Sequence, residues 1–176
     1  REIETGRAKL DSEQNAQSAK LSEGEKAIAQ AKDQFVEAES KISAGELELE
    51  KAQADLQSKL EEANQKEQEL LSVQGSLLTL QEKLPFMGDL ELREALLGLS
   101  ESLPHEMKVK GGPELSELER KLQANEEIRQ EEAMQALAKL SQELESGLAF
   151  ISKGKAEIEG GLEEISNKKS ELAQQK

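Results

Sequence analysis

The stretch LSEGEKAIAQAKDQFVEAESKISAGELELEKAQADL, residues 21–56, decides the fold that this sequence predicts. A large apolar residue recurs at every seventh position, and a glycine or alanine follows three residues after each of the first five. This spacing places both sets on one face of an α-helix, as in a coiled coil. The large residues are Leu21, Ile28, Phe35, Ile42, Leu49 and Leu56, and the small ones are Gly24, Ala31, Ala38, Gly45 and Ala52.

A matching pattern occupies residues 137–165, where large residues again recur at sevens and three glycines follow them. Facing residues of an antiparallel helix pair have numbers that add to a constant. A constant of 189 sets a large residue against a small one in eight successive layers, an alternation that fills the space between helices. This register predicts the structural contacts Ile28 with Gly161, Phe35 with Gly154 and Ile42 with Gly147.

The glycines of these two segments indicate close packing of two helices. Each glycine destabilises a helix by about 1 kcal/mol relative to alanine, and a close approach of the two backbones compensates. We therefore predict an all-α fold, a long antiparallel two-helix coiled-coil hairpin with a small helical and loop cap at its tip. Residues 1–83 would form the ascending arm, residues 84–113 the tip, and residues 114–176 the descending arm.

Composition and charge favour the same class. Charged residues make up 34% of the chain and aromatic residues 2%, which is typical of long helices. The net charge of −14 disfavours nucleic acid and anionic lipid as partners. No apolar run within residues 1–176 is long enough to cross a bilayer, and we expect no signal peptide within these residues. Because the chain starts at Arg1 and ends within a helical pattern, we expect a fragment that continues at both ends.

Prolines bracket the tip. Pro85 is expected to end the first helix, Asp89 to cap a short helix of about residues 89–102, and Pro113 to begin the return arm. Residues 103–112 are expected to form a loop with a short extended piece. Six apolar residues of the tip add more apolar surface than the pairing of two helices requires. If they are exposed together, they would form a partner-binding tip. They are Phe86, Met87, Leu90, Leu97, Met107 and Val109.

Each arm also contains a nearly all-polar stretch, residues 57–69 in the first and 125–132 in the second. We expect these to lie at the same height and to form a soft joint. No catalytic arrangement is predicted, because His105 is the only histidine and no phosphate-binding glycine pattern occurs. We expect a non-enzyme without cofactor or metal.

Three segments resemble the extracellular coiled-coil insertions of FtsX-like ABC transporter permeases of Gram-positive bacteria. They are KLSEGEKAIAQAKDQF and KISAGELELEKAQADL, within about residues 19–56, and SKGKAEIEGGLEEI, within the matching pattern of the second arm. The resemblance implies a parent permease that is membrane-embedded on both sides of the insertion, a partner ATPase in the cytoplasm, and a possible homodimer through the parent transporter. It also implies an extracellular stalk whose tip grips a substrate or an accessory or cell-wall protein, or transmits ATP-driven motion to it.

Two alternatives share the same heptad pattern. One is an intracellular coiled-coil scaffold, and the other is the adaptor hairpin of a membrane-fusion protein. Hydrophobic spans of about 20 residues just outside both ends of the sequence, if found, would favour the permease. A lipoyl-like β domain beside the hairpin would favour the adaptor. If neither the hydrophobic spans nor the β domain occurs, the scaffold is favoured.

Overall fold

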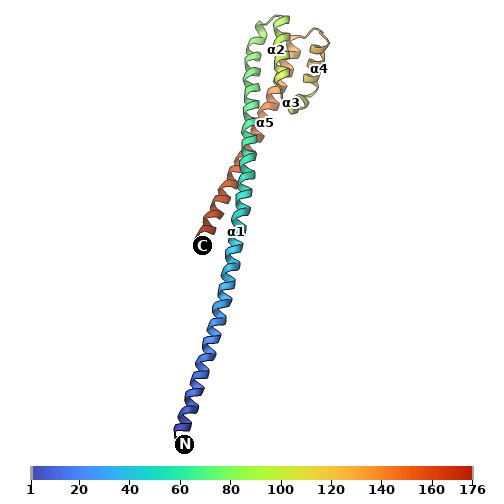
Figure 1. Ribbon diagram of the computed structural model, residues 1–176. Helices are drawn as coiled ribbons and strands as arrows, with labels where there is room; N and C mark the ends of the chain where they lie inside the picture. The colour runs from blue at the N-terminus through green and yellow to red at the C-terminus, as the bar shows by residue number, and fades with distance from the viewer. Residues whose placement is uncertain (1, 176) are drawn as a thin grey trace. The chain divides into compact units, whose positions relative to one another are not determined.

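The computed structural model describes residues 2–175, which form helices and connecting turns without any strand. The prediction of an all-helical chain with a long first helix is confirmed (Figure 1). No helix within residues 2–175 combines the length and hydropathy that crossing a bilayer requires. In chain order the elements are α1 (Glu2–Lys83), the 3-10 helix η1 (Leu84–Phe86), α2 (Asp89–Ser102), α3 (His105–Lys110), α4 (Gly112–Gln123) and α5 (Gln130–Gln174).

The chain divides into two compact units. The first comprises Arg1–Ala52 with Ile165–Lys176, and the second is Gln53–Glu164. Helices α2, α3 and α4 belong wholly to the second unit. Among residues 2–175, Ile165 is the one buried residue of the first unit, and all the others lie in the second.

The core of the second unit lies within residues 70–144, which we call the head. Its buried residues recur at intervals of three and four in α1, α2, α4 and α5, so each helix turns one apolar stripe inward. Helix α4 packs against both α2 and α3. The buried residues of the stripes are Leu70, Val73, Leu77 and Leu80 of α1, Leu92, Leu96 and Leu99 of α2, Leu115, Leu118 and Leu122 of α4, and Ala133, Ala136, Leu137, Leu140 and Leu144 of α5.

Two leucines of α1 pack on glycines of α5 in this unit. A Cβ atom placed on Gly147 would lie 3.3 Å from Cδ1 of Leu70, and one placed on Gly161 would lie 3.1 Å from Cδ1 of Leu56. In both pairs the residue numbers add to 217, and numbers rise along one helix as they fall along the other. These glycines are therefore explained by a bulky side chain in the space a Cβ would need.

The register predicted from the sequence is displaced from this one by 28 residues, four heptads. Leu70 and Leu56 occupy the positions over Gly147 and Gly161 that the sequence assigns to Ile42 and Ile28, so those assignments are wrong. The error is physical in origin. A heptad pattern fixes which face of a helix is apolar, but every displacement by whole heptads keeps that face inward.

The apolar content of the head selects the register. Val73 with Leu144 and Leu77 with Leu140 satisfy the same constant of 217, and all four residues are buried in one core. Large apolar residues on both sides of these layers remove more apolar surface from water than a large residue facing a glycine or alanine, as in the predicted register.

In the first unit, a Cβ atom on Gly45 would lie 3.7 Å from Cδ1 of Leu172, a pair whose numbers again add to 217. Nearer the N-terminus the large residues Leu21, Ile28 and Phe35 are exposed, Phe35 at 65%. This part of the heptad stripe is therefore not packed as a core within the described residues.

The descending arm is not one helix. Residues 125–132, expected to form a joint inside a continuous arm, contain the connection between α4 and α5. Asn125 adopts a left-handed conformation with φ of 55°. The N–H of Glu126 donates to the carbonyl of Lys121 at 3.0 Å, the bond that closes a helix at a left-handed residue. The other polar stretch, residues 57–69, remains helical within α1.

The expectation of a loop with an extended piece at residues 103–112 is also wrong, since α3 occupies His105–Lys110. Pro104 precedes its first residue, where a missing N–H costs nothing. Met107 is buried in the head core, which fixes this short helix by tertiary packing. Helix α2 spans Asp89–Ser102, where the sequence predicts a short helix, with Gly88 rather than Asp89 at its N-cap.

The glycine contacts make a testable prediction about stability. Replacing Gly161 with leucine should overpack the site against Leu56 and lower the free energy of unfolding by about 1–3 kcal/mol. The matched control is Gly154→Ala, because a Cβ atom at Gly154 meets nothing within 4 Å. That change should stabilise the chain by up to about 1 kcal/mol through helix propensity. Urea melts followed by circular dichroism would measure both, and equal effects of the same sign would contradict the register.

Candidate functional site

The six apolar residues predicted to form a partner-binding tip differ in exposure. Phe86, Leu90, Leu97 and Val109 are exposed, Phe86 at 88%, whereas Met107 is buried at 4% and Met87 is half-buried. Met87 and Met107 line two different cavities of the second unit. The exposed residues are distributed over η1, α2 and α3.

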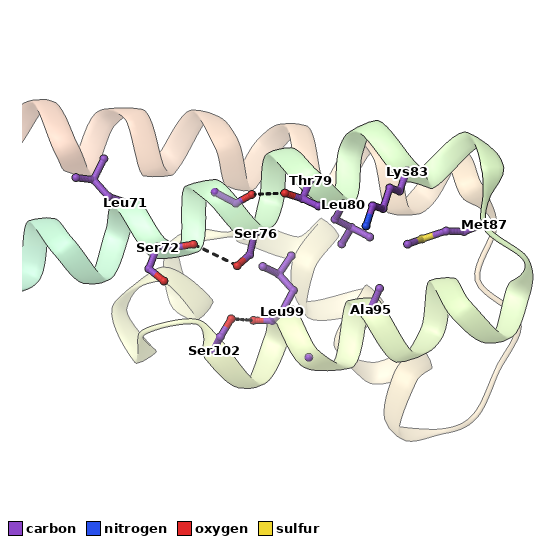
Figure 2. Close-up of a pocket in the computed structure, with 12 residues that line it drawn as sticks. Leu71, Ser72, Ser76, Thr79, Leu80, Lys83, Met87, Ala95, Leu99 and Ser102 are labelled. Carbon is purple, nitrogen blue, oxygen red and sulfur yellow. Dashed lines mark hydrogen bonds between the residues drawn. The ribbon is translucent and has the colours of Figure 1, made fainter.

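A groove lies between α1 and α2 in the head. One part has a volume of about 690 Å³, and Figure 2 shows Ser76 and Leu80 of α1 facing Ala95 and Leu99 of α2 across it. Met87 lies at the end of the groove beside Lys83 (Figure 2). The lining residues are Leu71, Ser72, Gly75, Ser76, Thr79, Leu80, Lys83, Met87, Ala95, Gly98, Leu99 and Ser102. We call this the α1–α2 groove.

The groove continues towards α3. A second part, with a volume of about 560 Å³, shares Ser72, Ser76 and Ser102 with the first. Its remaining lining residues are Gln65, Gln68, Glu69, Val73, Leu103 and Pro104. Small and uncharged side chains therefore dominate both parts.

Three of the four hydroxyl groups that line the groove, those of Ser76, Thr79 and Ser102, are bonded within the chain. Ser76 Oγ donates to the carbonyl of Ser72 at 3.2 Å, and Thr79 Oγ1 donates to the carbonyl of Gly75 at 2.9 Å. Ser102 Oγ donates to the carbonyl of Leu99 at 2.8 Å (Figure 2). Such local bonds satisfy the hydroxyl donors without water.

Polar bonds to other parts of the head hold α2 in place. Arg93 Nη1 donates to the carbonyl of Leu122 at 3.2 Å, and Arg93 Nη2 donates to the carbonyl of Glu126. Ser100 Oγ donates to Glu119 Oε1 at 2.6 Å. These contacts join α2 to α4 and to the turn that follows α4, on the side away from α1, so one wall of the groove is supported from behind.

A second cavity of about 610 Å³ lies between α1, α3 and α5. Its lining combines apolar side chains with charged ones, including the only histidine, His105, and the exposed ring of Phe150. Among residues 2–175 no three His, Cys, Asp or Glu side chains lie close enough together to hold a metal ion.

Ion pairs fix the turn between α4 and α5. Lys121 Nζ donates to Glu132 Oε2 at 2.7 Å, and Arg129 Nη2 donates to Glu132 Oε1 at 2.6 Å. The bond from Lys121, followed by the bond from Arg129, lowers the pKa of Glu132 to about 2 from an ordinary value of 4.5. In α1 and α5, Lys155 Nζ donates to Glu67 Oε2 at 2.6 Å, which pairs two half-exposed charges across the helices.

The lining of the α1–α2 groove was not predicted from the sequence, although a signal exists. Residues 70–81, LLSVQGSLLTLQ, contain no Asp, Glu, Lys or Arg in a chain in which such residues make up 34%. A heptad search assigns the leucines of this run to a core and passes over the serines, threonine and glycine between them.

Comparison of the chain with protein-family models, with curated proteins and with solved structures finds no match.

The pKa of Glu132 makes a prediction about pH. Because folding lowers this pKa, the ion pairs stabilise the head above about pH 4.5, and the contribution is lost as the pH falls from there towards about 2. Glu132→Gln should therefore lower the melting temperature at pH 7 and make progressively less difference between pH 4.5 and 2. The control is Glu145→Gln, a change at an exposed position of α5. A difference for Glu132→Gln that stays constant from pH 7 to pH 2 would contradict the assignment.

Proposed function

We propose that this chain is the extracellular stalk of an FtsX-like ABC transporter permease, non-catalytic, with α1 and α5 paired as an antiparallel coiled-coil hairpin and the head at its tip. The observation that carries the proposal is the contact of Leu56 with Gly161 and of Leu70 with Gly147 in one register. Large side chains seated on glycines bring helix axes close together. Such a pair resists sliding, because any displacement by less than a heptad would separate every large residue from its gap.

A stiff helix pair with a folded head suits the transmission of motion. A displacement imposed on the paired segments of α1 and α5 within the second unit would reach the head with little loss, since packed interfaces deform in discrete steps. The head would then grip a substrate or an accessory or cell-wall protein. The other partners of the stalk would be the parent permease and the ATPase of that permease.

The resemblance of residues 20–35, 41–56 and 152–165 to permease insertions supports the assignment to this transporter class. All three segments belong to the paired helices α1 and α5, so the resemblance concerns the stalk rather than the head. The location that follows from it is the outer face of the cell membrane.

One observation favours a second candidate, a coiled-coil scaffold or adaptor hairpin. The exposed heptad residues Leu21, Ile28 and Phe35 in the first unit offer an apolar stripe to a further helix. A scaffold that sets the spacing between partners would use such a stripe for assembly.

Surface labelling distinguishes these functions. The chain has no cysteine, so Ser58→Cys, at an exposed position of α1, gives one thiol in this region of the full natural protein. In intact host cells a membrane-impermeant maleimide should label this thiol as strongly as after lysis. The control, Leu140→Cys, is buried and should react only after denaturation. Labelling of Ser58→Cys only after lysis would place the chain inside the cell and support the scaffold.

A further inference from the structure

The α1–α2 groove is lined mostly by uncharged side chains, and Lys83 and Glu69 are the charged residues of its lining. The α1 wall comes mostly from the uncharged run of residues 70–81, and Ala95, Gly98, Leu99 and Ser102 form the α2 wall. Solvated helix faces elsewhere in this chain are dense in charge. A hollowed face with so few charges, in a chain as charged as this one, is typical of a surface that another molecule covers.

Two glycines in the groove have no role in the packing of the head. Gly75 lies within α1 and Gly98 within α2, and a Cβ atom built on either meets nothing within 4 Å. Alanine would favour both helices, and the fold leaves room for it. By contrast, Gly147 and Gly161 are explained by the leucines packed on them. The open space over Gly75 and Gly98 is what a closely packed third element would need.

Three of the four hydroxyl groups in the larger part of the groove could be covered without losing a bond, Ser72 being the exception. The hydroxyls of Ser76, Thr79 and Ser102 donate to carbonyls of their own helices. An apolar surface placed over them would not strand a hydroxyl donor, which is the main penalty of covering a polar wall. The floor beneath them is apolar, formed by Leu80 and Leu99.

The charge beside the groove selects the kind of occupant. Helix α2 carries four exposed acidic residues, Asp89, Glu91, Glu94 and Glu101. Its one basic residue, Arg93, is bonded to carbonyls of the turn after α4. The edge formed by α2 is therefore acidic, and a second copy of this chain would add another charge of −14. Electrostatic complementarity favours a basic partner.

We propose that the α1–α2 groove is the docking site for an amphipathic α-helix of a partner protein. The apolar face of that helix, with alanine and leucine, packs over Gly75 and Gly98, and lysine or arginine residues lie along its edge beside α2. Helix-in-groove recognition supplies the binding mode. The inference rests on the protein-binding role proposed for the head, and it is independent of the assignment to a permease.

A designed peptide tests this inference with the full chain. The probe is a fluorescein-labelled helix of 21 residues with leucine and alanine on one face and lysine along both edges. A matched peptide has glutamate in place of every lysine. Fluorescence anisotropy should show saturable binding of the lysine peptide, and the glutamate peptide should bind at least ten-fold more weakly. Absence of saturable binding by the lysine peptide overturns the proposal.

Variants locate the site. Gly75→Leu fills the groove and should weaken binding of the lysine peptide at least ten-fold, while the melting temperature stays the same or rises. The control is Gly6→Leu, because Gly6 is also a glycine inside α1 with nothing within 4 Å of a Cβ atom, and it lies outside the groove. Gly6→Leu should leave the affinity unchanged. Equal affinities of the two variants would mean that the peptide binds elsewhere, which overturns the docking site.

Self-association is measured in parallel by sedimentation of the chain without peptide. If the wild-type chain dimerises and Gly75→Leu abolishes the dimer, the occupant is a second copy and the proposal of a basic partner is overturned. A sedimentation profile that Gly75→Leu does not change supports it. Neither measurement depends on the cellular location, so a failure here is distinguishable from a failure of the surface-labelling test.

Discussion

The packing of leucines from α1 on the glycine and leucine stripe of α5 is the interaction on which the second unit depends. Leu70 reaches over Gly147, and Leu56 reaches over Gly161. Between Leu70 and the end of α1, the apolar stripe of α1 belongs to a core of buried residues. Helices α2, α3 and α4 pack their own apolar residues into this core. The glycines are unfavourable for the helix that contains them, so they persist only because the opposite side chains use the space.

The sequence was sufficient to predict an all-helical chain with a long first helix, but not the register of the helix pair. Heptad spacing identifies the apolar face of each helix, and the buried residues of α1 and α5 in the head follow that spacing. It cannot choose between registers that differ by whole heptads, because each places the same face inward. The choice depends on the total apolar surface buried along the pair. The leucine-rich layers around Leu77 and Leu140 bury more of it than the alternating layers, which would have placed Phe35 on Gly154.

The turn between α4 and α5 was hidden for a different reason. Asn125 supplies a left-handed residue, which is a weak signal because asparagine also occurs within polar helices. The turn is secured by Arg93, 32 positions earlier in the chain, through bonds to backbone carbonyls. A local reading of the sequence cannot detect a cap supplied by a residue so distant. Helix α3 also depends on tertiary contacts that a local reading cannot detect. Its six residues are held in place by the burial of Met107 in the head core.

The central claim is the register in which α1 and α5 pair, and a distance measured between spin labels tests it most directly. Cysteines introduced at the exposed positions Ser58 and Glu159 have numbers that add to 217. Pulsed electron paramagnetic resonance should give roughly 20–30 Å, one interaxial distance plus the arms of the two labels. A displacement of four heptads would separate these positions by about 40 Å along the helix axis alone. A distance of that size, or one that vanishes on dilution with unlabelled chain, would contradict the account.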